Sequence, residues 1–285
     1  MDFSLGVAAA LVAAAMYNAG IAVQAGEARR TTPRQSLRMS LLAQLAVRSR
    51  WIAGTLMVTL GWGLQAFALL ILPLTLVQPT LAAGLLILLF IGARFLGERV
   101  GPREVFGVLA IVAGIVGLAL AAPDRVVVES NWTNAGVTIA VLFVIASAPY
   151  VLRRTGRSGN LLVVLLAGTA YGCAGVATKF IADAASSGEW LTLVFWTLAT
   201  AVAAVVGLLN EMSALQRRPA TQVGPIMLVV DILVAVAGAS ALAGETWVST
   251  PFGGLLLGGA LVVIVAGATV LAASPAVAAV THRQS

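Results

Sequence analysis

The chain alternates long apolar runs with short polar breaks. Each run approaches the ~20 residues that a helix needs to cross the hydrocarbon core of a bilayer. The breaks contain Pro73, Pro79, Pro219 and Pro251, at or near positions where the missing N–H of proline is tolerated. The pattern predicts an all-α polytopic membrane protein. Its nine expected helices cover 5–25, 51–72, 77–96, 104–121, 134–152, 161–182, 190–215, 220–243 and 252–273.

One further apolar stretch, 36–47, is too short to span and contains Arg38 and Gln44. We interpret it as an interfacial helix inside the polar segment 26–50, leading into the second span.

The composition agrees with a membrane location. Of the 285 residues, 60% are hydrophobic and 10% are charged, whereas soluble domains carry about 25% charged residues. We expect the lipid bilayer as a partner and no separate soluble domain. The net charge of +6 comes from arginines in short loops, so nucleic acid is not an expected partner.

Few residues are available for redox or metal chemistry. Cys173 is the only cysteine, so an intrachain disulfide is excluded. His282 is the only histidine, which excludes a His/Cys metal cluster. We find no nucleophile–base or metal-ligand spacing, and we therefore expect neither an enzyme nor a bound cofactor.

The arginines predict an orientation. With nine spans, the arginines of segments 26–50, 97–103 and 153–160 fall on one side together with Arg217, Arg218 and Arg283. The opposite loops hold only Arg125. The positive-inside rule then places the N-terminus outside and the C-terminus in the cytoplasm of a cell-membrane protein.

The chain also resembles itself. "MYNAGIAVQ" (16–24) is similar to "AYGCAGVATK" (170–179), and "FLGERVGP" (95–102) to "LAGETWVSTP" (242–251). Gly61, Gln65, Pro73 and Pro79 recur at one constant offset as Gly207, Glu211, Pro219 and Pro225. We predict a first repeat at 1–121, a linker with one helix at 122–159, and a second repeat at 160–285. Five spans separate the two starts, so the repeats have inverted topology, a common transporter design.

The run "LQAFALLILPLTLVQPTLAAGLLILLFIGARFLGERVGPREVFGVLAIVAGIVG" resembles the third-to-fifth-helix region of the drug/metabolite transporter superfamily. "AAPD" (121–124), "NEMSALQRRPATQVGPI" (210–226) and the nine spans resemble its NIPA-like magnesium transporter branch most. The resemblance covers nearly the whole chain and implies a helical transporter, with divalent cations as its substrate class. Glu211 and Asp231 depart from that branch, where these positions are usually uncharged.

Three ionisable residues lie inside predicted spans: Lys179, Glu211 and Asp231. Each costs ~3 kcal/mol at the centre of a membrane helix, so such residues usually face a cavity or a partner. We predict that all three line a substrate or ion pathway, with Asp231 and Glu211 as candidate metal ligands. The structural alternatives are a protonated Asp231 bonded to a neighbouring helix, a Glu211 turned toward Arg217 and Arg218, and a Lys179 paired with Asp183.

Five polar residues extend the candidate pathway. Tyr17 and Gln24 share one helical face. Tyr171 and Lys179 share the corresponding face in the second repeat. Each one alone is more typical of helix packing or interhelical hydrogen bonding than of a pathway. The additional candidates are Tyr17, Asn18, Gln24, Gln65 and Tyr171.

Three functions remain open at this point. The first is a carrier of a small solute or a divalent, Mg²⁺-like cation that works by alternating access. The second is a proton-coupled exporter of a small organic metabolite or drug, in which Asp231 exchanges the proton. The third is a non-transporting membrane scaffold or regulator. The sequence also leaves a homodimer open.

Overall fold

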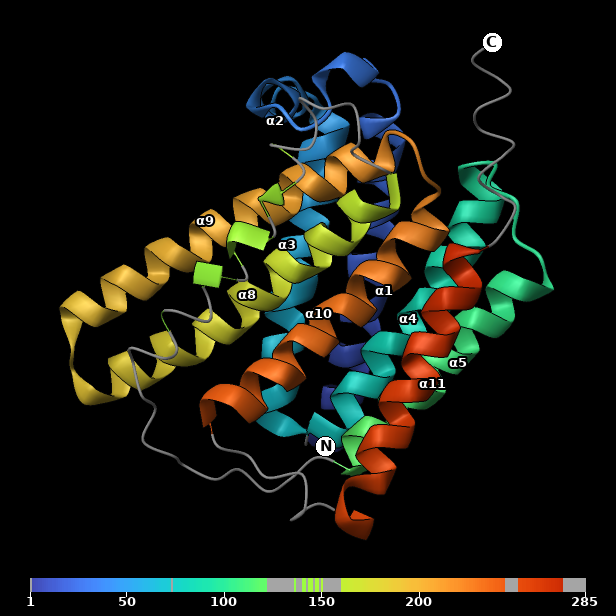
Figure 1. Ribbon diagram of the computed structural model, residues 1–285. Helices are drawn as coiled ribbons and strands as arrows, with labels where there is room; N and C mark the ends of the chain where they lie inside the picture. Colours follow the sequence, from blue (N-terminus) through green and yellow to red (C-terminus); the bar gives the residue numbers. More distant parts are fainter. Residues whose placement is uncertain are drawn as a thin grey trace.

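The computed structural model describes residues 2–72, 74–121, 160–243 and 251–273, together with isolated positions between 136 and 150. Every regular element in these ranges is a helix, as the apolar runs predicted (Figure 1). The α-helices are α1 (Asp2–Ala28), α2 (Met39–Ala46), α3 (Ser49–Ile71), α4 (Leu74–Phe95), α5 (Pro102–Ala121), α8 (Asn160–Ser187), α9 (Trp190–Leu215), α10 (Ala220–Ala243) and α11 (Leu255–Ala272). Two 3₁₀ turns, η1 (Pro33–Gln35) and η4 (Pro251–Gly254), precede α2 and α11.

Length and composition identify membrane-spanning helices. Within the described ranges, four helices are long and apolar enough to cross a membrane: Phe3–Ala28, Pro102–Ala121, Trp190–Leu215 and Leu255–Ala272. Shorter apolar helical stretches accompany them at Thr80–Phe95, Leu161–Ala177 and Ala220–Val234. The chain is therefore a multi-helical protein of membrane-spanning character. The helix predicted at 134–152 lies mostly outside the described residues.

Local chemistry explains where the helices begin and end. Pro102 opens α5, and the Glu104 side chain accepts the backbone N–H of Gly101 at 2.7 Å, which satisfies one of the unpaired donors at that terminus. Gly188, with φ of 74°, stops α8 in a conformation that favours glycine. Since no residue before Gly188 breaks the helix, α8 runs beyond its predicted end at 182. Pro79 lies inside α4, which begins earlier than expected.

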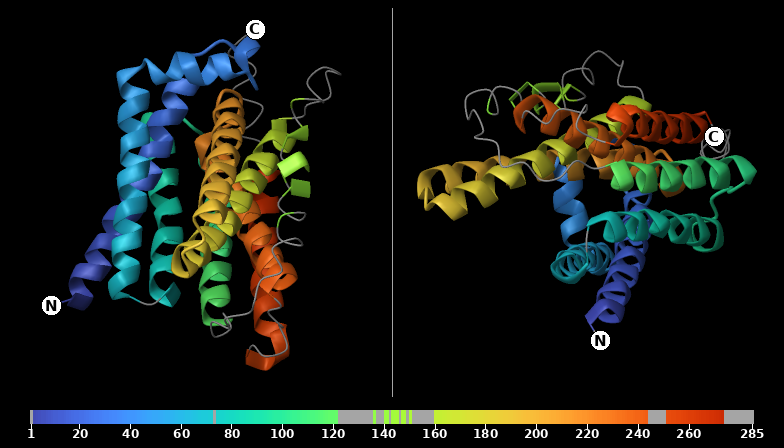
Figure 2. Two further views of the ribbon diagram at one scale, coloured as in Figure 1. Left: turned by 90° about the vertical axis from the view of Figure 1, so that its left-hand side faces the viewer. Right: turned by 90° about the horizontal axis from the view of Figure 1, so that it is seen from below.

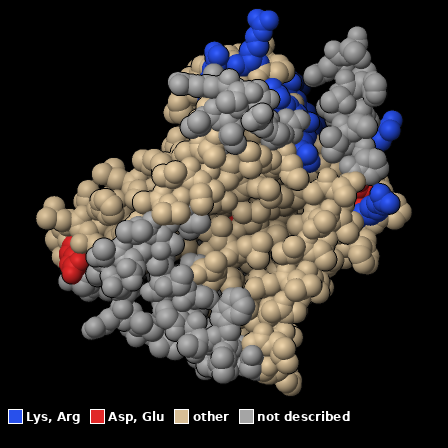
Figure 3. Space-filling view, in the orientation of Figure 1, with Lys and Arg blue, Asp and Glu red and all other residues tan. Residues whose placement is uncertain are grey.

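The segment predicted to be interfacial forms the short helix α2. It lies across one end of the bundle, beside the start of α3 (Figure 2). Its Leu41 and Leu45 side chains are fully buried, whereas Met39 is exposed. Lys and Arg side chains gather at this end (Figure 3). We call it the Arg-rich end, and the end where α1 begins the opposite end.

The packing divides the helices into two groups. In residues 1–121, α1 packs closely against α3 and α4. In residues 160–273, α8 packs in the same way against α9 and α10. The two groups, here the first and second halves, meet most extensively where α5 packs along α11 (Figures 1 and 2). The long α8–α9 hairpin leans away from α1 and α3 (Figures 1 and 2).

Glycines allow the closest approach of the two halves. A Cβ on Gly107 would lie 3.0 Å from the backbone oxygen of Gly267, and a Cβ on Gly114 would lie 2.4 Å from a side-chain carbon of Ile264. Small residues at such contacts let membrane helices pack backbone to backbone. The α5–α11 contact therefore depends on the absence of side chains at these positions.

Candidate functional site

Tyr171 and Glu211 form the core of the candidate site. The Tyr171 hydroxyl donates to the Glu211 carboxylate at 2.7 Å, across the contact between α8 and α9. Glu211 is 4% exposed, although it carries a carboxylate. Burying such a group is costly unless it is hydrogen-bonded, and the tyrosine supplies a bond. Among the described residues, Glu211 makes no ion pair with Arg217 or Arg218.

A glycine sets the position of this tyrosine. A Cβ on Gly207 would lie 3.0 Å from the Tyr171 ring, so the ring lies flat against the α9 backbone one turn before Glu211. In the first half, Gly61 meets the α1 backbone at Tyr17 in the same manner, with a Cβ 3.1 Å from its nitrogen. Gly61 and Gly207 are the repeated glycines of the two halves.

Tyr17 and Asp231 complete a cluster drawn from both halves. Tyr17 lies midway along α1 and is within electrostatic range of Glu211 and Asp231. Tyr171 is within range of the same two carboxylates and of Tyr17. We call Tyr17, Tyr171, Glu211 and Asp231 the central cluster. Its members come from α1, α8, α9 and α10.

The residues of the central cluster differ in exposure. Tyr17 keeps 38% of its surface exposed, although its neighbours Ala13 and Asn18 are buried. Asp231 is half-buried, and no donor among the described residues contacts its carboxylate. Tyr17 and Asp231 thus keep part of their surface exposed, and neither side chain bonds another described residue.

The other predicted pathway residues lie in different surroundings. The Asn18 amide donates to the Ala14 carbonyl at 2.9 Å and lies against Gly84 of α4. The Gln24 amide donates to the Thr55 hydroxyl at 3.0 Å in the α1–α3 contact. Both side chains therefore lie in contacts of α1 with neighbouring helices. Gln65 is half-buried in α3.

The predicted Lys179–Asp183 pair and the predicted metal ligands have different outcomes. Lys179 belongs to α8, but its side chain and that of Asp183 are not described. In the described part of the chain, no group of three or more Asp, Glu, His or Cys side chains is arranged to hold a metal ion.

A second set of polar contacts, not predicted from the sequence, lies at the Arg-rich end. The Glu98 side chain, 3% exposed, pairs with Arg29 at the end of α1. The same carboxylate accepts the backbone N–H groups of Ala220 and Thr221, at 2.7 and 3.0 Å, and the Thr221 hydroxyl at 2.6 Å. The only signal in the sequence was the position of Glu98 within the repeated segment "FLGERVGP".

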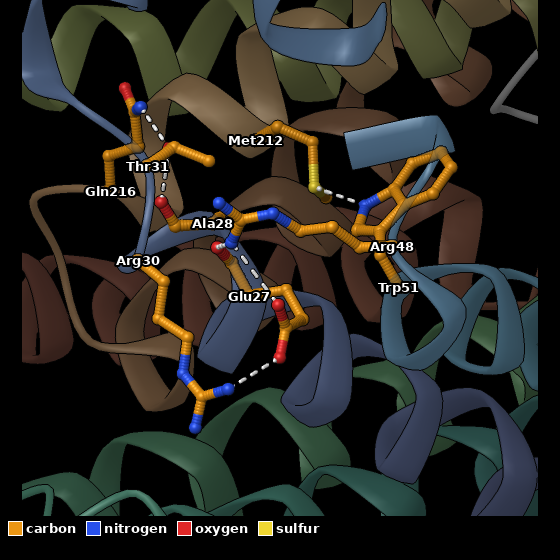
Figure 4. Close-up of polar contacts among 8 residues, drawn as sticks. All are labelled: Glu27, Ala28, Arg30, Thr31, Arg48, Trp51, Met212 and Gln216. Carbon is orange, nitrogen blue, oxygen red and sulfur yellow. Dashed lines mark hydrogen bonds and ion pairs between the residues drawn. The ribbon is translucent and has the colours of Figure 1, made fainter. Parts of the chain in front are cut away.

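Further bonds join the halves at this end. Gln216 donates to the Thr31 hydroxyl at 2.6 Å, and the Trp51 indole N–H points to the Met212 sulfur at 3.3 Å (Figure 4). The Leu37 N–H donates to Ser213 at 2.8 Å. These contacts connect the segment between α1 and the start of α3 to the C-terminal end of α9, just after Glu211.

Comparison with known proteins adds no family to this picture. No protein-family model, curated protein or solved structure matches the chain.

Proposed function

We propose that this chain is a membrane transporter of the drug/metabolite type, which moves a small solute or a cation by alternating access between two inverted halves. The observation that carries the proposal is the central cluster. Tyr171 bonds Glu211, and Tyr17 and Asp231, midway along α1 and α10, lie within electrostatic range of that pair. Ionisable residues at membrane depth are costly and usually mark substrate or proton pathways.

The packing supports the inverted repeat. The first helix of each half packs on the second and third helices, as α1 does on α3 and α4, and α8 on α9 and α10. The fourth helices, α5 and α11, pair with each other across the halves. Related contacts in two halves are what internal repeats produce. Together with the arginines gathered at one end, they support nine spans with that end in the cytoplasm.

The chemistry of the cluster bears on the substrate. A divalent ion that keeps some of its water, as Mg²⁺ does, could be held by a single carboxylate such as Asp231. A proton-coupled exporter of a small organic solute has more support, because the cluster also offers two aromatic faces. Tyr17 and Tyr171 would attract an organic cation through their rings, while Asp231 takes up or releases the proton.

Asp231→Asn tests the proposal, because asparagine keeps the size and hydrogen-bonding capacity but cannot ionise. Purified protein in proteoliposomes is assayed with and without a pH gradient, over divalent ions and small organic cations. We expect unchanged expression and thermal stability with loss of coupled transport. Asp231→Leu should lose transport too, with stability equal or higher.

Glu189→Gln provides the control, since Glu189 is an exposed carboxylate in the α8–α9 turn. Its transport should equal that of the unmodified protein. Full coupled transport in Asp231→Asn at equal protein density would show that the carboxylate is structural. A scaffold would be indicated if no substrate moved in any condition.

A further inference from the structure

At the Arg-rich end, the Glu98 side chain bonds residues of both halves. Glu98 receives four donors, from Arg29, from the backbone of Ala220 and from the backbone and hydroxyl of Thr221. Glu98 and Arg29 belong to the first half, and the other two residues open α10 in the second half. Bonds to an ionised carboxylate are stronger than neutral ones, and the first N–H groups of a helix have no partner within it. We call these four residues the latch.

The backbone brings Glu98 to this position. Gly97, with φ of 64°, turns the chain after α4, and the Glu98 N–H bonds back to the Gly92 carbonyl at 3.0 Å. A Cβ on Gly92 would lie 2.4 Å from the Thr221 side chain. The start of α10 can therefore approach α4 only because residue 92 is glycine.

Helix pairs that the repeat relates to each other differ in how closely they pack across the two halves. α1 packs against α9 and α10, and α10 packs against α5. The repeat relates these pairs to α8 with α3, α8 with α4, and α4 with α11, which make fewer contacts in the described part of the chain. An inverted repeat becomes asymmetric in this way when one end is closed and the other is not.

The latch and the central cluster share the helix α10. Thr221 is ten residues before Asp231 on α10, about 15 Å along the helix at 1.5 Å per residue. At the same end, Arg218 has two guanidinium nitrogens, Nε and Nη1, shielded from solvent without a partner among the described residues. Burial lowers the pKa of this guanidinium. Opening this end would return the Arg218 charge to water. The buried guanidinium therefore destabilises the closed arrangement and favours opening.

We propose that the latch is the gate at the Arg-rich end, and that release of α10 from Glu98 opens this end to the solvent. The inference rests on the transport function proposed above. It identifies the residues that hold the Arg-rich end closed or let it open. It concerns conformation, so it is tested without a transport assay.

The test uses two buried reporter cysteines, one in each of two proteins that carry Cys173→Ala. Ser213→Cys lies at the Arg-rich end beneath Leu37, and Leu72→Cys lies at the opposite end against α1; both positions are at most 5% exposed. The full chain is placed in nanodiscs, where both faces meet the solvent. The rate of labelling by a water-soluble maleimide is then measured.

Glu98→Ala should raise the labelling rate of Ser213→Cys about tenfold, the equilibrium change that 1.4 kcal/mol produces. Labelling of Leu72→Cys should not rise. Gly92→Ala should act in the same direction, because its Cβ would displace Thr221. Glu98→Gln should give a labelling rate between those of the intact latch and Glu98→Ala. If Glu98→Ala does not fold, Glu98→Gln and Gly92→Ala decide the question.

Glu27→Gln is the matched control. Glu27 is another buried carboxylate at this end, but its partners Arg30 and Arg48 both lie in the first half (Figure 4). It should leave both labelling rates unchanged. The latch proposal is overturned if the Glu98 and Gly92 variants leave Ser213→Cys unlabelled, or if they expose both reporters equally, as general loosening would. Either result leaves the Asp231 experiment to decide the transport function by itself.

Discussion

At the scale of single residues, the sequence identified the chemistry of the central cluster but not its assembly. Asp231 and Glu211 stood out because charged residues are rare inside apolar runs. That Tyr171 would bind Glu211 followed only from the α8–α9 contact in space. Glu98 was missed as a bridging residue, because its partners at the start of α10 are distant in the sequence and two of its donors are backbone N–H groups, which every residue except proline carries.

The Tyr171–Glu211 bond makes a prediction at this scale. Tyr171→Phe removes the donor and leaves the buried Glu211 carboxyl unsatisfied, so thermal unfolding in detergent should report a loss of about 1–3 kcal/mol. Tyr17→Phe is the control, since no described residue bonds the Tyr17 hydroxyl, and its stability should change by less than about 0.5 kcal/mol. Equal losses in the two variants would mean that the hydrogen bond contributes little.

At the scale of helices, most boundaries were predictable to within about one turn. Apolar runs bounded by arginine and proline leave little choice of helix ends, and α8 was the exception. Helix contacts were less predictable. Gly107 and Gly114 of α5 meet α11 closely, whereas Gly258 of α11 has no atom within 4 Å of a built Cβ. Gly254, with φ of 85°, caps α11 instead of packing. Small residues indicate that close contact is allowed, and only the three-dimensional arrangement decides where it occurs.

The α5–α11 contact makes the prediction at the scale of helices. Gly114→Ala would place a methyl group 2.4 Å from Ile264 and 2.9 Å from the Ala260 carbonyl. Overpacking of this kind costs about 1–3 kcal/mol, and the apparent Tm should fall. Gly258→Ala on the partner helix meets open space, so its Tm should stay equal or rise. A Gly114→Ala protein as stable as Gly258→Ala would show that the two helices separate without cost.

At the scale of the whole molecule, the distribution of arginines predicted one basic end. Apart from α2, the described helices run between that end and the opposite one (Figure 1). What the sequence could not supply is which end is shut, because that depends on contacts between halves that are far apart in the chain.

The topology can be measured on two exposed positions of the described chain. Ser40 lies in the first turn of α2 at the Arg-rich end, and Glu189 lies in the α8–α9 turn. In a Cys173→Ala background, Ser40→Cys should react with an impermeant maleimide only from the cytoplasmic side, and Glu189→Cys only from outside. Reaction of both from one side would refute the nine-span topology.

The pairing of α5 with α11 has a consequence for biogenesis. During synthesis, α5 enters the membrane long before α11 exists, since most of the second half must be made in between. Until then, the glycine face of α5 meets lipid or a temporary partner. Domains made first generally fold first, but the first half cannot complete its largest contact with the second half until α11 arrives. A ribosome that stalls within the second half would leave this face uncovered, and that uncovered face is a feature by which membrane quality control could recognise an unfinished chain.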